Sequence, residues 1–337
     1  MWFGTRKMDT SRRSNQKLFA LLVTAAIIGA PAVRGYQING PTIGYIVDST
    51  SRIRTIDGIP GASAIGAPVN VSTKIRHSLF LVKGDYALAV SEDTGKLLLI
   101  THLSSVPEVS PITSVAEGAK LFALSPDGSS AAVYSPGASL LQIIGGLPLD
   151  PVVRFEVETK SMRQITAIGI NTNGQVLAAD SDGNSGSLYL VGPDGVRRFI
   201  QTVGNVSSIA YDVSGDRALV ADRGSNDVFL IQNLSGNASS FLLAGRDGAS
   251  IPAAVAFSSD GKTAYIANRG SETITVANLA GGTPRSVPCR CQPTTMTLLR
   301  DSLYVVTERT DQPIALLDAS GDEARVRFVP PATSTDK

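Results

Sequence analysis

Polar side chains recur at one position of this sequence, at the end of apolar runs that predict β-strands. The position holds, in chain order, Asp48, Glu92, Ser135, Asp180, Asp222, Asn268 and Glu308, and Arg223, Arg269 and Arg309 directly follow the last three. Carboxylate and amide oxygens are ligands for Ca²⁺, whereas arginines bind carboxylates and phosphates. The pattern therefore predicts a charged rim that holds a divalent cation or an acidic ligand.

The same residues also have a purely structural interpretation. Asp and Asn at the end of a strand often cap the following hairpin, because their side chains accept hydrogen bonds from the backbone two residues on. A structural turn would repeat in this way, so we favour capping for the set as a whole. The rim stays the candidate ligand site.

Catalytic motifs are scarce. The two histidines, His77 and His102, have no Ser or Cys partner at a recognisable spacing, and the sequence contains no nucleophile elbow, phosphate loop or zinc-protease helix. We therefore predict no catalytic residue. The remaining catalytic hypothesis is a hydrolase in which a bound metal, and not a histidine, lowers the pKa of the attacking water.

The elements that would position the rim are marked by turn signals. Asn or Asp before Gly stands at Asn39-Gly40, Asp127-Gly128, Asn173-Gly174 and Asp260-Gly261, and variants stand at Gly84-Asp85, Ser214-Gly215 and Arg300-Asp301. Glycine tolerates the positive φ that a two-residue hairpin connection needs. The signals recur every 40 to 46 residues, which is typical of one four-stranded propeller blade.

Apolar runs on both sides of these turns predict the strands. Inner strands are expected at 121–125, 165–170, 206–211, 253–258 and 294–299, and Ala123, Ala167, Ala210, Ala254 and Ala256 should line a crowded central channel. Radial stacking would bury both faces of each blade. The sequence therefore predicts an all-β fold, a seven-bladed β-propeller of four-stranded antiparallel blades over residues 33–330, followed by a flexible tail at 331–337.

The sequence leaves two alternatives for how the first and last blades close the ring. Val33–Ile38 supplies the inner strand of the first blade if a leader is cut directly before it, or the two ends of the chain share one blade. The spacing does not decide between them.

The first 32 residues read as a signal peptide. Basic residues stand at Arg6, Lys7, Arg12, Arg13 and Lys17, before an apolar run at 18–30 and the small-residue triplet Ala30-Pro31-Ala32. A run of 13 residues is short of the roughly 18 that a transmembrane helix needs. We predict ordinary secretion in preference to the twin-arginine route, and a secreted or periplasmic protein with no stable membrane span after cleavage.

Cysteine usage and charge give weaker signals. Cys289 and Cys291 flank Arg290, and neighbouring side chains on an extended strand point to opposite faces, so a disulfide would be strained. We favour two free or partly buried cysteines over a strained bridge or a link between chains. The net charge of +1 disfavours nucleic acid as a partner.

One unit carries a family resemblance. Residues 257–268 form an Asp-Gly turn and a Thr-Ala-Tyr-Ile-Ala-Asn strand, followed by Ile274-Thr275-Val276, and this closely resembles the repeat of YVTN-type β-propellers. Residues 124–134 and 217–231 match parts of the same pattern. The resemblance implies a fold and a surface, because such propellers include binding scaffolds, surface-layer proteins and relatives of phosphogluconolactonase.

Three functional hypotheses follow. The leading one is a monomeric, noncatalytic scaffold with no cofactor, which binds a protein, peptide or glycan through loops at one end of the channel. The alternative is a lactonase-like, metal-assisted hydrolase with a divalent cation at the channel mouth. A third is a structural role in a cell-envelope layer, through strand addition at exposed blade edges.

Overall fold

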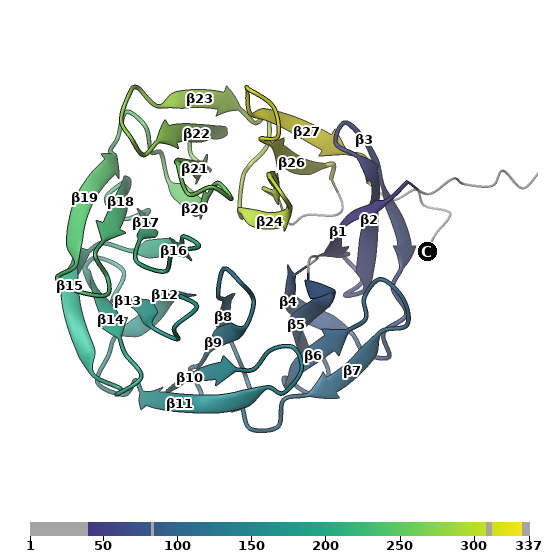
Figure 1. Cartoon of the computed structure of the whole chain (residues 1–337), viewed down its shortest axis with the longest axis horizontal. Coiled ribbons are helices and arrows are strands. Elements are labelled where there is room, and N and C mark those ends of the chain that lie inside the picture. Colours follow the sequence, from purple (N-terminus) through teal and green to yellow (C-terminus); the bar gives the residue numbers. More distant parts are fainter. Residues whose placement is uncertain (1–39, 82–83, 308–311, 332–337) are drawn as a thin grey trace, which may run out of the picture. The chain divides into compact units, whose positions relative to one another are not determined.

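The computed structural model describes residues 40–81, 84–307 and 312–331, all within one compact unit. Seven antiparallel sheets stand around a common axis in this unit (Figure 1). The predicted seven-bladed β-propeller is confirmed. The predicted signal peptide and the segment Val33–Ile38 lie outside the described residues, as do Glu308, Arg309 and most of the predicted tail.

The blades follow one another in sequence, and six of them contain four strands. The first contains β1 (Thr42–Val47), β2 (Ile53–Ile59) and β3 (Ala62–Pro68); the second β4 (Ile75–Leu81), β5 (Tyr86–Ser91), β6 (Leu97–Thr101) and β7 (Glu108–Pro111); the third β8 (Leu121–Leu124), β9 (Ser130–Ser135), β10 (Leu140–Gly145) and β11 (Val152–Glu158). The fourth contains β12 (Gln164–Ile170), β13 (Val176–Ser181), β14 (Gly186–Val191) and β15 (Arg197–Val203); the fifth β16 (Val206–Tyr211), β17 (Ala218–Asp222), β18 (Asp227–Gln232) and β19 (Ser239–Ala244). The sixth contains β20 (Pro252–Phe257), β21 (Thr263–Asn268), β22 (Thr273–Asn278) and β23 (Arg285–Pro288); the seventh β24 (Thr297–Arg300), β25 (Leu303–Val305), β26 (Ile314–Asp318) and β27 (Arg325–Val329).

Burial changes with the position of a strand in its blade. The second strands are covered on both faces, and every residue of β5, β13 and β17 is buried. The outermost strands, such as β11 and β15, keep many side chains exposed. A central strand between two neighbouring blades has apolar partners on both sides, so it reads as a continuous apolar run and not as an alternating one. No helix in the described ranges has the length and apolar character to cross a bilayer.

The core consists of apolar clusters between adjacent blades. One of them joins the two ends of the ring, where Ile43 and Ile56 of the first blade pack with Leu303, Ile314 and Leu316 of the seventh. Among the described strands none is shared between these two blades. The ring is therefore closed by side-chain packing, and the shared-blade alternative finds no support in the described part of the chain.

Most turns between first and second strands are longer than the predicted two residues. In the third blade the Ser125 N–H donates to the Ser130 carbonyl at 2.9 Å, and the Gly128 N–H donates to the Ser125 carbonyl at 2.9 Å. Gly128 has the expected positive φ of 76°. In this blade the prediction of a two-residue connection was wrong, because Asp127 accepts hydrogen bonds from the Ser125 hydroxyl (2.7 Å) and the Ser129 N–H (3.1 Å) and so stabilises a longer loop. In the seventh blade two residues, 301–302, do connect β24 to β25.

Polar side chains tie these turns to the next blade. Each donor reaches a backbone carbonyl in or beside a neighbouring turn: Tyr86 bonds to Gly128, Asn171 to Gly215 (2.9 Å), Arg217 to Gly261 (2.9 Å) and Tyr304 to Phe257 (2.9 Å). The bonds fix the angle between neighbouring blades at one end of the channel, in addition to the apolar packing.

The two cysteines are joined. Cys289 and Cys291 form a disulfide with their Cα atoms 5.0 Å apart, so the favoured expectation of free cysteines was wrong. That expectation assumed an extended strand. Arg290 instead has a φ of 53°, which turns the backbone and brings both sulfurs to the same side.

Candidate functional site

The predicted rim residues stand at the ends of second strands, on one end of the propeller. Asp222 and Asn268 are the last residues of β17 and β21, and Asp180 is the penultimate residue of β13. Asp48 and Glu92 come one residue after β1 and β5. The second strands of all blades run in the same direction, so these residues are distributed around one channel mouth and are not gathered in one cluster.

The buried rim carboxylates are occupied by the backbone. Asp222 accepts hydrogen bonds from the N–H groups of Gly204 (2.6 Å), Asn205 (2.7 Å) and Gly224 (2.9 Å). Asp180 accepts two backbone N–H groups at 3.0 and 3.1 Å. Both carboxylates therefore join the connection before a blade to the chain that follows the second strand, at Gly224 for Asp222 and at Ser187 for Asp180, which is a structural role.

Asp48 is held by a cation. Its carboxylate lies 2.7 Å from the buried Arg54 guanidinium and also accepts the Thr50 hydroxyl at 2.6 Å. Burial raises the pKa of Asp48, but hydrogen bonds from Thr50, Arg54 and the Arg52 backbone outweigh it and leave the pKa below its ordinary value. Asp48 thus stays ionised and is already neutralised by its neighbour.

Asn268 and Glu92 differ from the other rim residues. Asn268 accepts the Ser250 N–H at 3.1 Å and donates to the Thr275 hydroxyl at 2.9 Å, so its amide is saturated. Glu92 is exposed. No group of three or more His, Cys, Asp or Glu side chains within the described ranges is placed to hold a metal ion.

Two rim arginines share a cavity. Arg223 and Arg269, on adjacent blades, line a hollow of about 240 Å³ together with Thr166, Ser207 and Thr294. Both arginines are exposed, and neither forms an ion pair with any residue that the structure describes. The sequence placed both on the rim. Thr166 and Ser207 come from the inner strands β12 and β16, Thr294 precedes β24, and none of the three carried a signal of its own.

The central channel is lined by apolar and hydroxyl side chains of the inner strands. A cavity of about 440 Å³ runs between the inner strands, and all five predicted channel alanines, Ala123, Ala167, Ala210, Ala254 and Ala256, line it. The small side chains fit where inner strands converge. The two histidines are apart: His102 lies 3.9 Å from Glu108 on the exposed surface, and His77 borders a different cavity.

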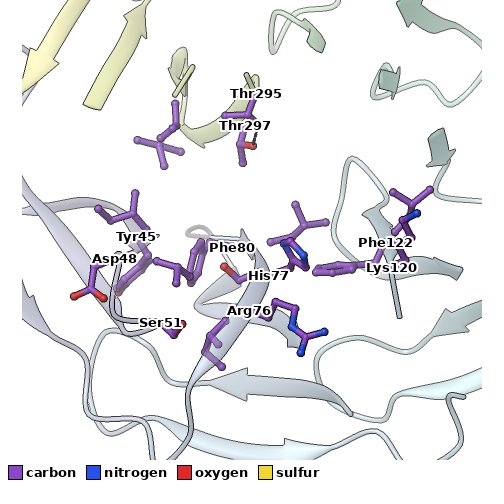
Figure 2. Close-up of a pocket in the computed structure, with 18 residues that line it drawn as sticks. Tyr45, Asp48, Ser51, Arg76, His77, Phe80, Lys120, Phe122, Thr295 and Thr297 are labelled. Atoms are coloured by element: carbon purple, nitrogen blue, oxygen red, sulfur yellow. Dashed lines mark hydrogen bonds between the residues drawn. The ribbon is translucent and has the colours of Figure 1, made fainter. Parts of the chain in front are cut away.

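That last cavity was not predicted from the sequence. It measures about 460 Å³ and lies between β1, β4 and β24. Figure 2 shows Tyr45 and Phe80 on one side of it and Thr295 and Thr297 across from them. The only hint in the sequence was the unresolved question of which segment forms the first strand of the first blade.

Comparison with known proteins supports the fold alone. No family profile and no curated protein matches the chain. Among solved structures, a functionally unknown protein from Desulfotomaculum acetoxidans is 16% identical, with a TM-score of 0.58 over 86% of this chain and 99% of that chain. A protein from Lactobacillus plantarum is 15% identical, with a TM-score of 0.59 over 85% and 95%. Virginiamycin B lyase from Staphylococcus aureus is 14% identical, with a TM-score of 0.55 over 76% and 84%.

Proposed function

We propose that the protein is an exported, noncatalytic binding scaffold that holds an acidic segment of a protein partner at the channel mouth beside Arg223 and Arg269. The observation that supports it is the cavity these arginines share with three hydroxyl side chains. Guanidinium groups bind carboxylates with two parallel hydrogen bonds. The Thr166 and Ser207 hydroxyls donate to the Ala179 and Pro252 carbonyls, which leaves the Thr294 hydroxyl as the one that can donate to a remaining ligand oxygen. The YVTN-type assignment and the secreted or periplasmic location belong to the same proposal.

The neighbouring carboxylates do not compete for the arginines. Asp222 and Asn268 stand next to them in sequence, but their oxygens accept backbone N–H groups. The positive charge of Arg223 and Arg269 is therefore free to face a ligand. The lactonase-like alternative would instead need open carboxylates here, and Asp180 and Asp222 are engaged.

Substitution of the arginine pair tests the proposal. A hydrogen bond to a charged group contributes about 1.5–3 kcal/mol, so Arg223→Ala or Arg269→Ala should weaken binding of a labelled oligoglutamate peptide by about 10- to 100-fold. Binding should also weaken as salt concentration rises. Fluorescence anisotropy gives both readouts.

The matched control is Arg300→Ala. Arg300 is also exposed but closes the inner strand β24, at the opposite end of the channel, so its removal should leave the affinity unchanged. Equal affinities for wild type and the Arg223→Ala, Arg269→Ala double variant would contradict the proposal. A sulfated oligosaccharide in a parallel titration distinguishes a glycan from a peptide ligand.

A further inference from the structure

Ile251, an isoleucine with a left-handed backbone, lies in the wall of the arginine cavity. Its φ is 46°, and the residue is 49% exposed. Positive φ is rare for a β-branched residue, because the Cβ crowds the backbone. The next residue is Pro252, and a residue before proline is restricted to extended conformations. Ile251 is therefore held in a conformation that its own side chain and the following proline both oppose.

Hydrogen bonds from the rim impose this conformation. The Ile251 N–H donates to the Asn226 side-chain oxygen at 2.6 Å, and the Ile251 carbonyl accepts the Arg269 N–H at 3.2 Å. The preceding Ser250 N–H donates to the Asn268 side-chain oxygen at 3.1 Å. A strained backbone persists only where its surroundings fix it in this way. The rim residues of the fifth and sixth blades thus hold Ile251 in place.

Gly270 makes room for the same segment. Its N–H donates to the Ser250 carbonyl at 2.9 Å. A Cβ at Gly270 would lie 2.5 Å from the Ser250 Oγ and 3.1 Å from the Ile251 Cγ1, so a larger residue would crowd both side chains. Three consecutive residues of the sixth blade, Asn268, Arg269 and Gly270, therefore fit the segment 250–251 closely.

The side chains around Ile251 make part of the cavity wall apolar. Val206, Ile251, Pro252 and Ala253 line the cavity together with the two arginines. Single exposed apolar residues need no explanation, but Ile251 combines exposure with a backbone that Gly or Asn would adopt more easily. Strained residues cluster at ligand-binding sites. The conformation presents an apolar side chain to the cavity that the two arginines line.

We propose that the arginine cavity selects an acidic residue with an aliphatic residue directly beside it, and that Ile251 determines this specificity. The inference rests on the proposed function, because Arg223 and Arg269 must bind the carboxylate. The cavity of about 240 Å³ is small, so the carboxylate and the group that contacts Ile251 must lie close together on the ligand. That contact removes apolar area of both side chains from water, which a purely acidic segment cannot do.

Two labelled peptides of equal charge test the preference. Glu-Glu-Leu-Glu-Glu and Glu-Glu-Ala-Glu-Glu differ only in the apolar side chain, and the wild type should bind the leucine peptide about fivefold or more tightly in fluorescence anisotropy. Ile251→Gly removes the contact, so it should bind both peptides with the affinity that the wild type has for the alanine peptide. Ile251→Leu keeps an aliphatic side chain and should keep the preference.

A comparison of stabilities tests the strain without any ligand. Alanine normally gives a higher urea midpoint than glycine at the same position, because glycine has more freedom in the unfolded chain. At a positive φ the order should reverse, so Ile251→Gly should unfold at a higher urea concentration than Ile251→Ala. Val213 is the matched control, since it is also β-branched and exposed (64%) but has no positive φ. There the alanine variant should be the more stable one.

Three results would overturn the inference: equal binding of both peptides by the wild type, an unchanged preference in Ile251→Gly, or a higher urea midpoint for Ile251→Ala than for Ile251→Gly. Equal binding that is lost in the Arg223→Ala, Arg269→Ala double variant would remove only the specificity and leave the proposed function intact. If the wild type binds neither peptide, the proposed function fails, and the inference fails with it.

Discussion

Removal of the Tyr304 hydroxyl tests whether hydrogen bonds between blades stabilise the ring. Tyr304 is 1% exposed and donates to the Phe257 carbonyl of the preceding blade at 2.9 Å. Burial raises the pKa of Tyr304 above its ordinary value, so the hydroxyl keeps its proton and remains a donor. Tyr304→Phe retains the ring, which packs 5.2 Å from the ring of Tyr265, and deletes only the hydrogen bond. A buried carbonyl left without its partner costs about 1–3 kcal/mol of unfolding free energy.

A second tyrosine provides the matched control. The Tyr211 hydroxyl is buried and has no hydrogen-bond partner among the described residues. Tyr211→Phe removes a hydroxyl of the same kind without breaking a bond, so it should leave the unfolding free energy unchanged or raise it by up to about 1 kcal/mol. Urea denaturation of wild type and both variants gives the two differences. Equal stabilities for Tyr304→Phe and wild type, or an equal loss in both variants, would refute the role assigned to the hydrogen bond between blades.

Three further predictions concern stability. Because the pKa of Asp48 is lowered in the folded state, its ionised carboxylate stabilises the fold at pH values above its ordinary pKa of 3.8, and this contribution is lost as the pH falls through the folded-state pKa. The loss of unfolding free energy in Asp48→Asn, measured by urea denaturation at pH 7, should therefore become smaller in acid. A loss that does not depend on pH would contradict this prediction. Ile56 is fully buried where the ring closes, so Ile56→Ala should cost about 2–5 kcal/mol, whereas Leu149→Ala at a side chain 94% exposed should change stability by less than about 0.5 kcal/mol. Because Asp180 and Asp222 already accept backbone N–H groups, Ca²⁺ or a chelator should leave the Tm unchanged, and a reproducible shift would instead favour the hydrolase alternative.

Turn chemistry made the fold predictable from the sequence. Positive φ at Gly128, Gly174, Gly215 and Gly261 occurs where the Asn/Asp-Gly and Ser-Gly signals stand, and the spacing of these turns sets the blade length. The channel alanines were also predictable, because crowding near the axis restricts side-chain size. The turn glycines depend on local sequence, and both they and the channel alanines recur from blade to blade, so a single sequence contains several copies of each signal.

Features that depend on contacts between distant segments were not predictable. The sequence showed that Asp222 and Arg223 are neighbours. It did not show that the Asp222 side chain accepts hydrogen bonds from the backbone of 204–205, or that Arg223 lines a cavity. The direction depends on the preceding connection, which brings the Gly204 and Asn205 N–H groups to the carboxylate. The disulfide was missed for a similar reason, since the left-handed backbone at Arg290 has no signature in the three residues themselves.

Side-chain packing between the described first and seventh blades constrains the order of folding. Ile43 and Ile56 near the start of the propeller find their apolar partners in Ile314 and Leu316 near its end. Every shorter chain emerging from a ribosome or a translocation channel would leave both terminal faces in water, however many complete blades lay between them. Folding of the last blade therefore buries two apolar faces at once, its own and that of the first blade. Truncated chains that stop before β26 should aggregate more readily than the full chain, even though most of their blades are complete.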